Sequence, residues 1–311
     1  MATGGRRRVR YEAYRIRTRC WLQRGLRLSN WPKACKLVCD ELREGRQYGP
    51  DLRDNAGFTD EEINKFCREL RLSAQLSVDA FLEHRREFLN LGKAAMALML
   101  VRKEVPGNLW FFGDANWMRY MFSRLNAPFE SFHEIPVSFI TFNYDRSLEH
   151  FLCTALQSKY GKTEAECAAV LEHIPIIHLH GRLGYLPWEK GEGQRPYDAT
   201  INREVLNTCI KNIKVVHEDI KDGRDKDFAR AFDLMQDADC IYYLGFGYGP
   251  VNMERLKIRD LLAGKLTYGT GKGLTQHECD EARNLVGGTS QLNPLPGLDC
   301  TQLLRNYVDW T

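Results

Sequence analysis

The chain has 311 residues, with 44 Lys and Arg against 41 Asp and Glu and a formal net charge of +3 at pH 7. This length allows one large domain or two ordinary ones, and a hydrophobic content of 43% with 27% charged residues excludes a disordered or fibrous chain. The near-balanced charge gives no general reason to expect nucleic acid as a partner.

The apolar runs and the cysteines favour a cytoplasmic protein with no membrane partner. The longest apolar run, Ala94 to Val101, is far shorter than the roughly 20 residues that span a bilayer. The N-terminal arginines are followed by more charge, so we expect no secretory signal. The 10 cysteines lack the spacing of a disulfide framework, which favours reduced thiols.

A structural zinc ion is not expected either. Cys35 and Cys39 have no second close pair to complete a tetrahedral site. His178 and His180 lie two apart, and a strand would point both to one face without supplying the other two ligands.

The first 36 residues are strongly basic and show no strand pattern. A single acid, Glu12, stands among the basic residues Arg6, Arg7, Arg8, Arg10, Arg15, Arg17, Arg19, Arg24, Arg27, Lys33 and Lys36. Such a segment is typical of a basic arm that binds RNA or an acidic surface. The alternatives are a solvated tail, or a segment whose recorded sequence is not the native one.

From about residue 55 to 126 the pattern is helical. Thr59 and Glu62 form a capping-box signature, and Ser77 predicts the start of a second helix. A third helix contains Ala94 to Val101 and is apolar on several sides, which indicates burial between neighbours. A fourth helix is predicted after Asp114, with the apolar stripe Trp117, Tyr120, Met121 and Leu125.

After Pro136 short β-rich runs alternate with helices. The predicted strands are 137–142, 174–179, 240–244 and 265–268. Apolar stripes predict helices over 148–155 and 228–235, and Thr275 with Glu278 forms a further capping box. Strands that are apolar on both faces and alternate with helices indicate an α/β fold with a parallel sheet covered on both sides.

Three polar segments follow predicted strands, where ligands bind in an open parallel sheet. The first runs from Thr141 to Asp145, although its Asn or Asp could simply cap the next helix. The second is His180, whose near-neutral titration suits a general base, although a satisfied core histidine is the more common explanation. The third is Gly245 to Pro250, whose glycines would let the backbone approach a phosphate or ribose; the G-x-G-x-x-G spacing fails at the proline.

The order of these segments resembles the SIR2-like family, relatives of sirtuins found widely in bacterial defence proteins. T-x-N-Y-D is followed by L-H-G and then L-G-F-G, and 77–94 looks like that family's helical insert. The resemblance covers roughly Ser77 to Leu256. It implies a Rossmann-like parallel sheet flanked by helices, which binds NAD. The implied organisation is one domain over 1–311, with a core of 1–54 and 127–311 and a helical insert of 55–126.

The resemblance also implies roles for the residues on the nicotinamide side of the site. Thr141, Asn143 and Asp145 would bind the nicotinamide ribose and the nicotinamide end, and Asn143 would help place the attacking water. His180 would be the base that acts on the ribose hydroxyl or on that water. Nicotinamide leaves C1′ through an oxocarbenium-like state, which requires a dry pocket, a ribose clamp and a nearby base.

On the other side of the implied site, Gly245, Phe246 and Gly247 would line the adenosine and phosphates, and Asn252 would lie near the adenine ribose. No metal is implied. Sirtuins that deacylate lysine carry two C-x-x-C zinc pairs, and carry Gln where this chain has Phe142. Their absence favours NAD+ hydrolysis over deacylation.

One part of the family pattern is not matched. The first strand of the family ends in a glycine-rich loop of the G-A-G-x-S type, which cradles the pyrophosphate, and nothing between Met1 and Pro50 matches it. Because 31–42 resembles the helix that follows this loop, the loop should fall near Arg19 to Asn30. A start-site or reading-frame difference upstream of Trp31, or decay of the site, would explain the mismatch.

The first hypothesis is therefore an NAD+ hydrolase that yields ADP-ribose and nicotinamide, with an anti-phage defence role implied only by the resemblance. The second is a catalytically silent module that binds NAD or ADP-ribose, or holds a partner protein. A sirtuin-type deacylase and RNA binding through the basic arm are weaker options. NAD+ is the expected partner, and a homo-oligomer or a sensor protein is left open.

Overall fold

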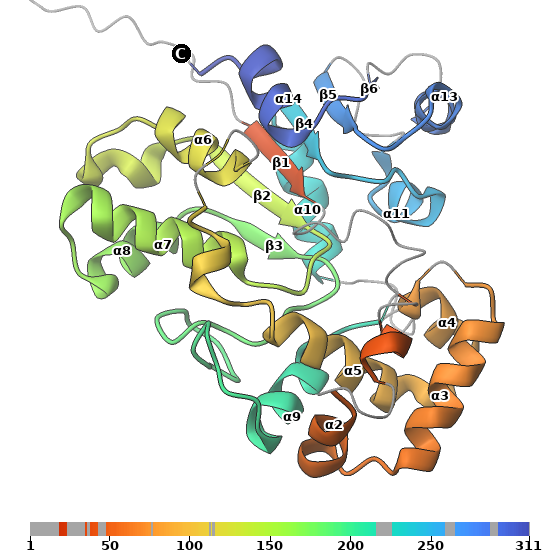
Figure 1. Ribbon diagram of the computed structural model, residues 1–311. Helices are drawn as coiled ribbons and strands as arrows, with labels where there is room; N and C mark the ends of the chain where they lie inside the picture. Colours follow the sequence, from red (N-terminus) through yellow and green to blue (C-terminus); the bar gives the residue numbers. More distant parts are fainter. Residues whose placement is uncertain are drawn as a thin grey trace, which may run out of the picture.

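The computed structural model describes residues 19–23, 35, 38–42, 48–75, 77–111, 113, 116–215, 226–258, 265–286 and 292–310. Figure 1 shows a sheet with helices on both faces and, below it, a separate lobe of helices. The strand arrows of β1, β2 and β3 point toward this lobe, so their carboxyl ends face it.

Six parallel strands form one sheet in the order β3-β2-β1-β4-β5-β6. They are β1 (Arg19–Gln23), β2 (Val137–Thr141), β3 (Ile176–His178), β4 (Cys240–Leu244), β5 (Leu266–Gly271) and β6 (Leu292–Pro296). The sheet grows from β1 to β3 on one side and from β4 to β6 on the other. The direction of growth reverses between β1 and β4, and a crevice forms beyond the strand ends at such a switch point.

The central strand β1 contradicts the prediction that the first 36 residues contain no strand. Trp21 is in register with Phe139 on one side and with Tyr242 on the other. Pairing with two buried neighbours, and not local composition, determines this strand. Because Arg19–Gln23 form this strand, the glycine-rich loop expected near Arg19 to Asn30 does not lie in these five residues. The rest of that range, and most of the basic arm, lie outside the described residues.

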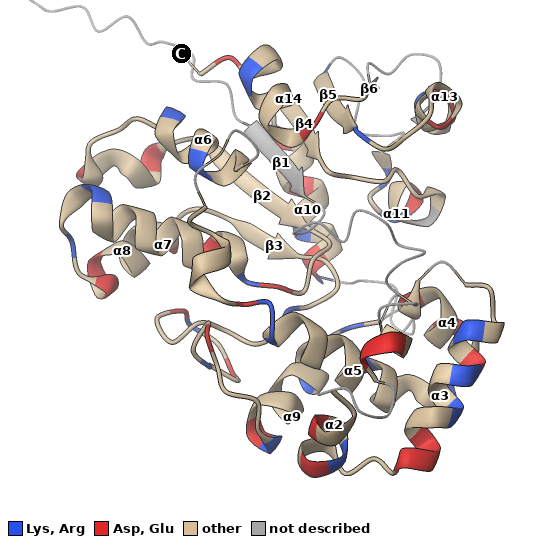
Figure 2. Cartoon of the chain, viewed as in Figure 1, with Lys and Arg blue, Asp and Glu red and all other residues tan. Residues whose placement is uncertain are grey.

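The other predicted strands are confirmed, with small changes at their ends. Every residue of β2 and of β4 is buried, and Figure 2 shows β2 and β3 without charged residues. Successive residues of β4 face opposite sides: Tyr242 packs in one hydrophobic cluster and Tyr243 in another.

Helices cover both faces of the sheet, as predicted. On the face that contains Phe139 and Tyr242 lie α6 (Trp117–Arg124), α7 (Ser147–Tyr160), α8 (Glu164–Leu171) and α14 (Cys300–Tyr307). On the face that contains Ile140 and Tyr243 lie α10 (Lys226–Asp237), α11 (Pro250–Arg255) and α13 (Gln276–Val286). The sheet is therefore buried between two layers of helices.

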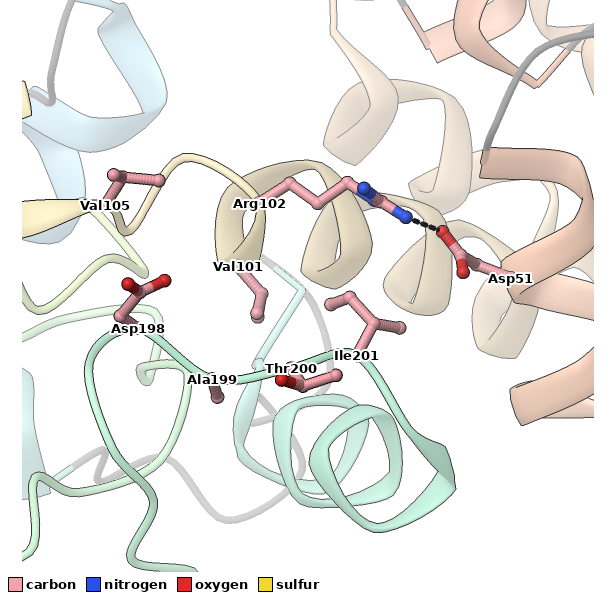
Figure 3. Close-up of a pocket in the computed structure, with 8 residues that line it drawn as sticks. All are labelled: Asp51, Val101, Arg102, Val105, Asp198, Ala199, Thr200 and Ile201. Atoms are coloured by element: carbon pink, nitrogen blue, oxygen red, sulfur yellow. Dashed lines mark hydrogen bonds and ion pairs between the residues drawn. The ribbon is translucent and has the colours of Figure 1, made fainter.

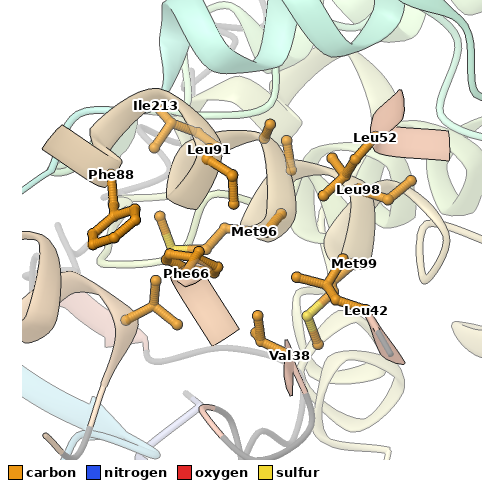
Figure 4. Close-up of a cluster of buried hydrophobic side chains, with 14 of the residues drawn as sticks. Val38, Leu42, Leu52, Phe66, Phe88, Leu91, Met96, Leu98, Met99 and Ile213 are labelled. Atoms are coloured by element: carbon orange, nitrogen blue, oxygen red, sulfur yellow. The ribbon is translucent and has the colours of Figure 1, made fainter. Parts of the chain in front are cut away.

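The helical lobe consists of α2 (Tyr48–Ala56), α3 (Asp60–Leu72), α4 (Val78–His84), α5 (Leu89–Val101) and α9 (Arg203–Asn212). The predicted Thr59–Glu62 capping box opens α3, and Ser77 caps α4. Helix α5 is buried on nearly every side, and Figure 4 shows two of its residues, Leu91 and Leu98, in the hydrophobic cluster of the lobe. The lobe does not coincide with the predicted insert, 55–126. Helices α2 and α9 belong to the lobe, whereas α6, which lies inside the predicted range, packs on the sheet.

Two further findings concern the described residues only. None of their helices has both the length and the apolar character that a bilayer span needs. Nine of their cysteines are free thiols, eight of them buried.

Candidate functional site

The register of the sheet places the starts of the three predicted segments at the same level along the strand direction. Gln23 pairs with Thr141 of β2 and with Leu244 of β4, and Thr141 pairs with His178 of β3. With strands spaced about 4.8 Å apart, the ends of β2 and β4 lie roughly 10 Å from each other across β1. The segments after β2, β3 and β4 therefore border a single region.

Phe142 is the residue that joins the three segments. Its ring centroid lies 5.4 Å from that of His180 and 5.3 Å from that of Phe246. The His180 ring also meets Phe228 of α10 edge-on, at 6.0 Å. All four side chains are buried, so the imidazole of His180 lies in a largely aromatic, water-poor setting.

Asn143 is held through its backbone. Its amide N–H donates to Thr141 Oγ1 at 3.1 Å, and its carbonyl oxygen accepts from His178 Nδ1 at 2.7 Å. The residue itself is half-buried. Neighbouring groups thus fix the turn that carries the carboxamide.

Tyr144, the next residue, connects the sheet to the helical lobe. Its phenol donates to Asp79 Oδ1 of α4 at 2.9 Å, and its carbonyl accepts from the amide of Leu183 at 2.8 Å. The lobe therefore contacts the turn after β2 directly.

Asp145 stands two residues before α7, whose N-cap position is Arg146, so it is not the helix cap that the alternative predicts. Its Oδ1 accepts from the amide of Ser147 at 3.1 Å. Burial raises the pKa of this carboxyl, and the nearby negative charge of Glu104 raises it further. The hydrogen bonds from Ser147 lower the pKa but do not offset these two effects.

The glycine segment after β4 is partly exposed and tied to β5. Gly245 has a φ of +66°, which favours glycine, and its amide donates to Thr270 Oγ1 at 2.7 Å. Gly245 and Gly247 are exposed, whereas Phe246 between them is buried. Asn252 lies further along, half-buried on α11.

The two histidines do not share a face, so that prediction is wrong. His178 Nε2 lies 2.5 Å from Glu149 Oε1 of α7, whereas His180 contacts α10 on the opposite side of the sheet. The strand ends at His178, and Gly181, with a φ of +72°, turns the chain immediately after His180. The alternation of side chains along a strand therefore does not extend to His180.

A buried ion cluster supports this region, and sequence reasoning did not find it. Arg146, fully buried, pairs with Glu104, and Arg195 donates to the same carboxylate. The only local signal was the position of Arg146 directly after Asp145. Its partners lie 42 and 49 residues away, beyond the reach of any periodic pattern.

A cavity of about 410 Å³ lies elsewhere, beside α2 and the end of α5. Figure 3 shows Asp51 paired with Arg102 on one side and Asp198 to Ile201 on the other. None of the predicted site residues lines it. Across the described part of the chain, no three His, Cys, Asp or Glu residues are grouped so as to hold a metal ion.

Comparisons of the chain with models of protein families, with curated proteins and with solved structures gave no match.

Proposed function

We propose that this chain is a cytoplasmic NAD+ hydrolase with a Rossmann-like core, which cleaves the bond between nicotinamide and ribose. The observation that carries the proposal is the contact of Phe142 with His180 and Phe246, which joins the ends of β2, β3 and β4. The strand order agrees with it, since the order 3-2-1-4-5-6 is that of dinucleotide-binding folds.

In the proposed reaction, water adds its oxygen to C1′ of the nicotinamide ribose. The bond from C1′ to nicotinamide breaks, and its electron pair leaves with nicotinamide. The neutral imidazole of His180 takes the proton of the water, directly or through a ribose hydroxyl. Asn143 orients the water, and the buried rings of Phe142 and Phe228 exclude bulk solvent around the base.

The dinucleotide fits the segment after β4 through backbone and not through charge. Gly245 and Gly247 are exposed and carry no side chain, so phosphate or ribose can approach the backbone closely. Lys and Arg are absent between Cys240 and Asn252. Within this segment a pyrophosphate would therefore depend on main-chain donors.

The test is NAD+ consumption by the purified chain. His180→Ala and Asn143→Ala should each lower turnover at least tenfold, while His277→Ala, which changes an exposed histidine of α13, should not. Wild-type turnover in both site variants would refute the assignment. Release of ADP-ribose without transfer to an acyl-lysine peptide separates hydrolysis from the deacylase alternative.

A catalytically silent module that binds NAD or ADP-ribose is the second candidate. It is motivated by the sequence of residues 19–30, which lacks the G-A-G-x-S pattern. Charge-assisted contacts are worth about 1.5–3 kcal/mol each, so a lost phosphate cradle would weaken binding by several kcal/mol. Calorimetry that detects ADP-ribose binding in a chain without turnover would favour this candidate.

A further inference from the structure

Two basic residues, Lys214 and Arg255, lie beside the aromatic group that contains His180. The backbone amide of Lys214 donates to the carbonyl oxygen of His180 at 2.9 Å. The guanidinium carbon of Arg255 lies 4.0 Å from the ring centroid of Phe228, and the same ring meets that of His180 at 6.0 Å. Both residues are therefore neighbours of the proposed base, and the sequence analysis gave neither of them a role.

The side chain of Lys214 extends over the turn that follows β3. A Cβ on Gly181 would lie 3.3 Å from its Cγ, so the stem of the lysine passes along the backbone directly after His180. Its Nζ lies 3.3 Å from Oδ2 of Asp227, near the start of α10. The two side chains are 38% and 44% exposed, and an ion pair this open to solvent is weak. A doubly charged anion can therefore replace Asp227 at the ammonium.

Arg255 is the last residue of α11, the helix that follows the glycine segment after β4. Phe228, Phe246 of the glycine segment and Met253 of α11 pack in one hydrophobic cluster, on the face of the sheet that α10 and α11 cover. The turn that carries Asn143 is instead bonded to His178, which faces α7 on the other side of the sheet. Arg255 thus lies on the side of the proposed site that is assigned to adenosine and the phosphates.

The covalent structure of NAD+ determines where its phosphates must lie. The nicotinamide ribose is bonded through C1′ to nicotinamide and through its 5′ oxygen to the diphosphate. If His180 acts at C1′, the diphosphate lies one ribose away from it, toward the glycine segment. That segment supplies no cation, because Lys and Arg are absent between Cys240 and Asn252. Ammonium and guanidinium groups are the usual side-chain partners of phosphate oxygens.

We propose that Lys214 and Arg255 bind the diphosphate of the dinucleotide, in place of the glycine-rich loop whose pattern this sequence lacks. The proposal rests on the proposed function and deepens it by naming phosphate-binding residues. In the free chain Asp227 is the counter-ion of Lys214, and the diphosphate replaces it on binding. Arg255 keeps its contact with Phe228 and donates to the same diphosphate.

Calorimetry with inorganic pyrophosphate tests this site in the full chain without turnover. Lys214→Met and Arg255→Met keep an unbranched stem but lose the charge, and each should weaken binding about tenfold, as expected for one charge-assisted contact. Asp227→Asn should tighten binding, because the amide no longer competes for the ammonium. Lys211→Met is the matched control: this ammonium also pairs with an exposed carboxylate, and its loss should leave the affinity unchanged.

Kinetics with NAD+ give a second readout. A phosphate contact is made equally in the ground state and in the transition state, so both cation variants should raise the KM for NAD+ with little change in kcat. Pyrophosphate should inhibit the wild-type chain competitively. A wild-type chain that binds no pyrophosphate, or cation variants that bind it as the wild type does, would overturn the proposal. An equal loss in Lys211→Met would also overturn it, because the effect would then be one of general surface charge.

The two readouts separate this proposal from the proposed function. If the wild-type chain hydrolyses NAD+ and both cation variants keep its KM, the phosphate assignment is wrong and the hydrolase assignment stands. If the wild-type chain consumes no NAD+ but its affinity for pyrophosphate depends on Lys214 and Arg255, the hydrolase assignment fails. The phosphate site then remains, as the catalytically silent module requires.

Discussion

The carboxylate of Glu104 and the guanidinium of Arg146 form a fully buried ion pair between the end of α5 and the start of α7. Oε2 lies 2.7 Å from Nη2, while Oε1 accepts from both Nε and the backbone amide of Arg146 at 3.1 Å. Arg195 adds a bond of 2.5 Å to Oε2. The rest of the Arg146 guanidinium donates to the carbonyl oxygens of Tyr185, Arg195 and Pro196. The pair therefore fixes Arg146, the residue directly after Asp145, from three segments of the chain.

Removing the carboxylate that Arg146 and Arg195 share should strongly lower the free energy of unfolding. Glu104→Ala leaves two buried guanidinium groups without their counter-ion, and breaking a buried pair in this way costs about 3–5 kcal/mol. Denaturant unfolding would measure the loss. Glu192→Ala, which removes a pair with Lys211 whose side chains are 91% and 75% exposed, should cost less than about 1 kcal/mol. Equal losses in the two variants would contradict the stabilising role given to Glu104.

The sheet could be predicted from sequence where local pattern decides the structure. Strands β2 and β4 are buried along their whole length, and both read as short β-rich runs, although β2 includes Ser138 and Thr141. The capping boxes at Thr59 and Thr275 mark the starts of α3 and α13 by spacing alone. The segments after β2, β3 and β4 could be placed in one region because parallel strands end at one edge.

What sequence could not supply depends on distant contacts. The strand Arg19–Gln23 carries an arginine and a glutamine at its ends, and only its two neighbours identify it. The partners of Glu104 lie 42 and 91 residues away. The opposed directions of His178 and His180 depend on where β3 stops, which its apolar pattern does not determine.

The contact between Tyr144 and Asp79 predicts a measurable link between the sheet and the helical lobe. Tyr144→Phe keeps the buried ring but removes the donor to a carboxylate, and hydrogen bonds to charged groups are worth about 1.5–3 kcal/mol. Hydrogen exchange should rise in α4. Tyr160→Phe is the matched control. The Tyr160 phenol donates to the carbonyl of Ala127, and both residues pack with the helices that cover the sheet, away from α4. Unchanged exchange in α4 would show that the bond does not hold the lobe.

Gly269 and Tyr248 should be energetically coupled. A Cβ at Gly269 would lie 1.8 Å from the Tyr248 oxygen, so Gly269→Ala must displace that phenol from its bond to the Thr270 carbonyl. Overpacking of this kind costs about 1–3 kcal/mol. Because Tyr248→Phe removes the atom in conflict, Gly269→Ala should cost less in that background.

A double-mutant cycle with urea unfolding measures this coupling. Gly107→Ala is the control, since a Cβ there meets no atom within 4 Å, and its effect should stay within about 0.5 kcal/mol. Strict additivity of the Gly269 and Tyr248 substitutions would be evidence against the predicted contact beside the glycine segment.

The substitution Asp145→Asn should have opposite effects on stability and on activity. Its folded-state pKa is raised by burial and by Glu104, so the folded chain binds this proton more tightly than the unfolded chain does. Stability contributed by the protonated carboxyl is therefore present below about pH 4, the ordinary range of Asp, and is lost as the pH rises through that range toward the raised value. Asp145→Asn retains an oxygen that can accept from the Ser147 amide but carries no charge. At pH 7 the variant should be more stable than the wild type, and the difference should shrink as the pH falls toward 3.

The same substitution should lower NAD+ turnover at least tenfold, because the proposed site uses the Asp145 carboxylate at the nicotinamide ribose. Urea unfolding at a series of pH values, alongside the turnover assay, separates the two effects. Asp233→Asn, an exposed change on α10, should alter neither. A variant that gained no stability at neutral pH would contradict the unfavourable negative charge of Asp145, whereas one that gained stability and kept full turnover would leave Asp145 only its bond to the Ser147 amide.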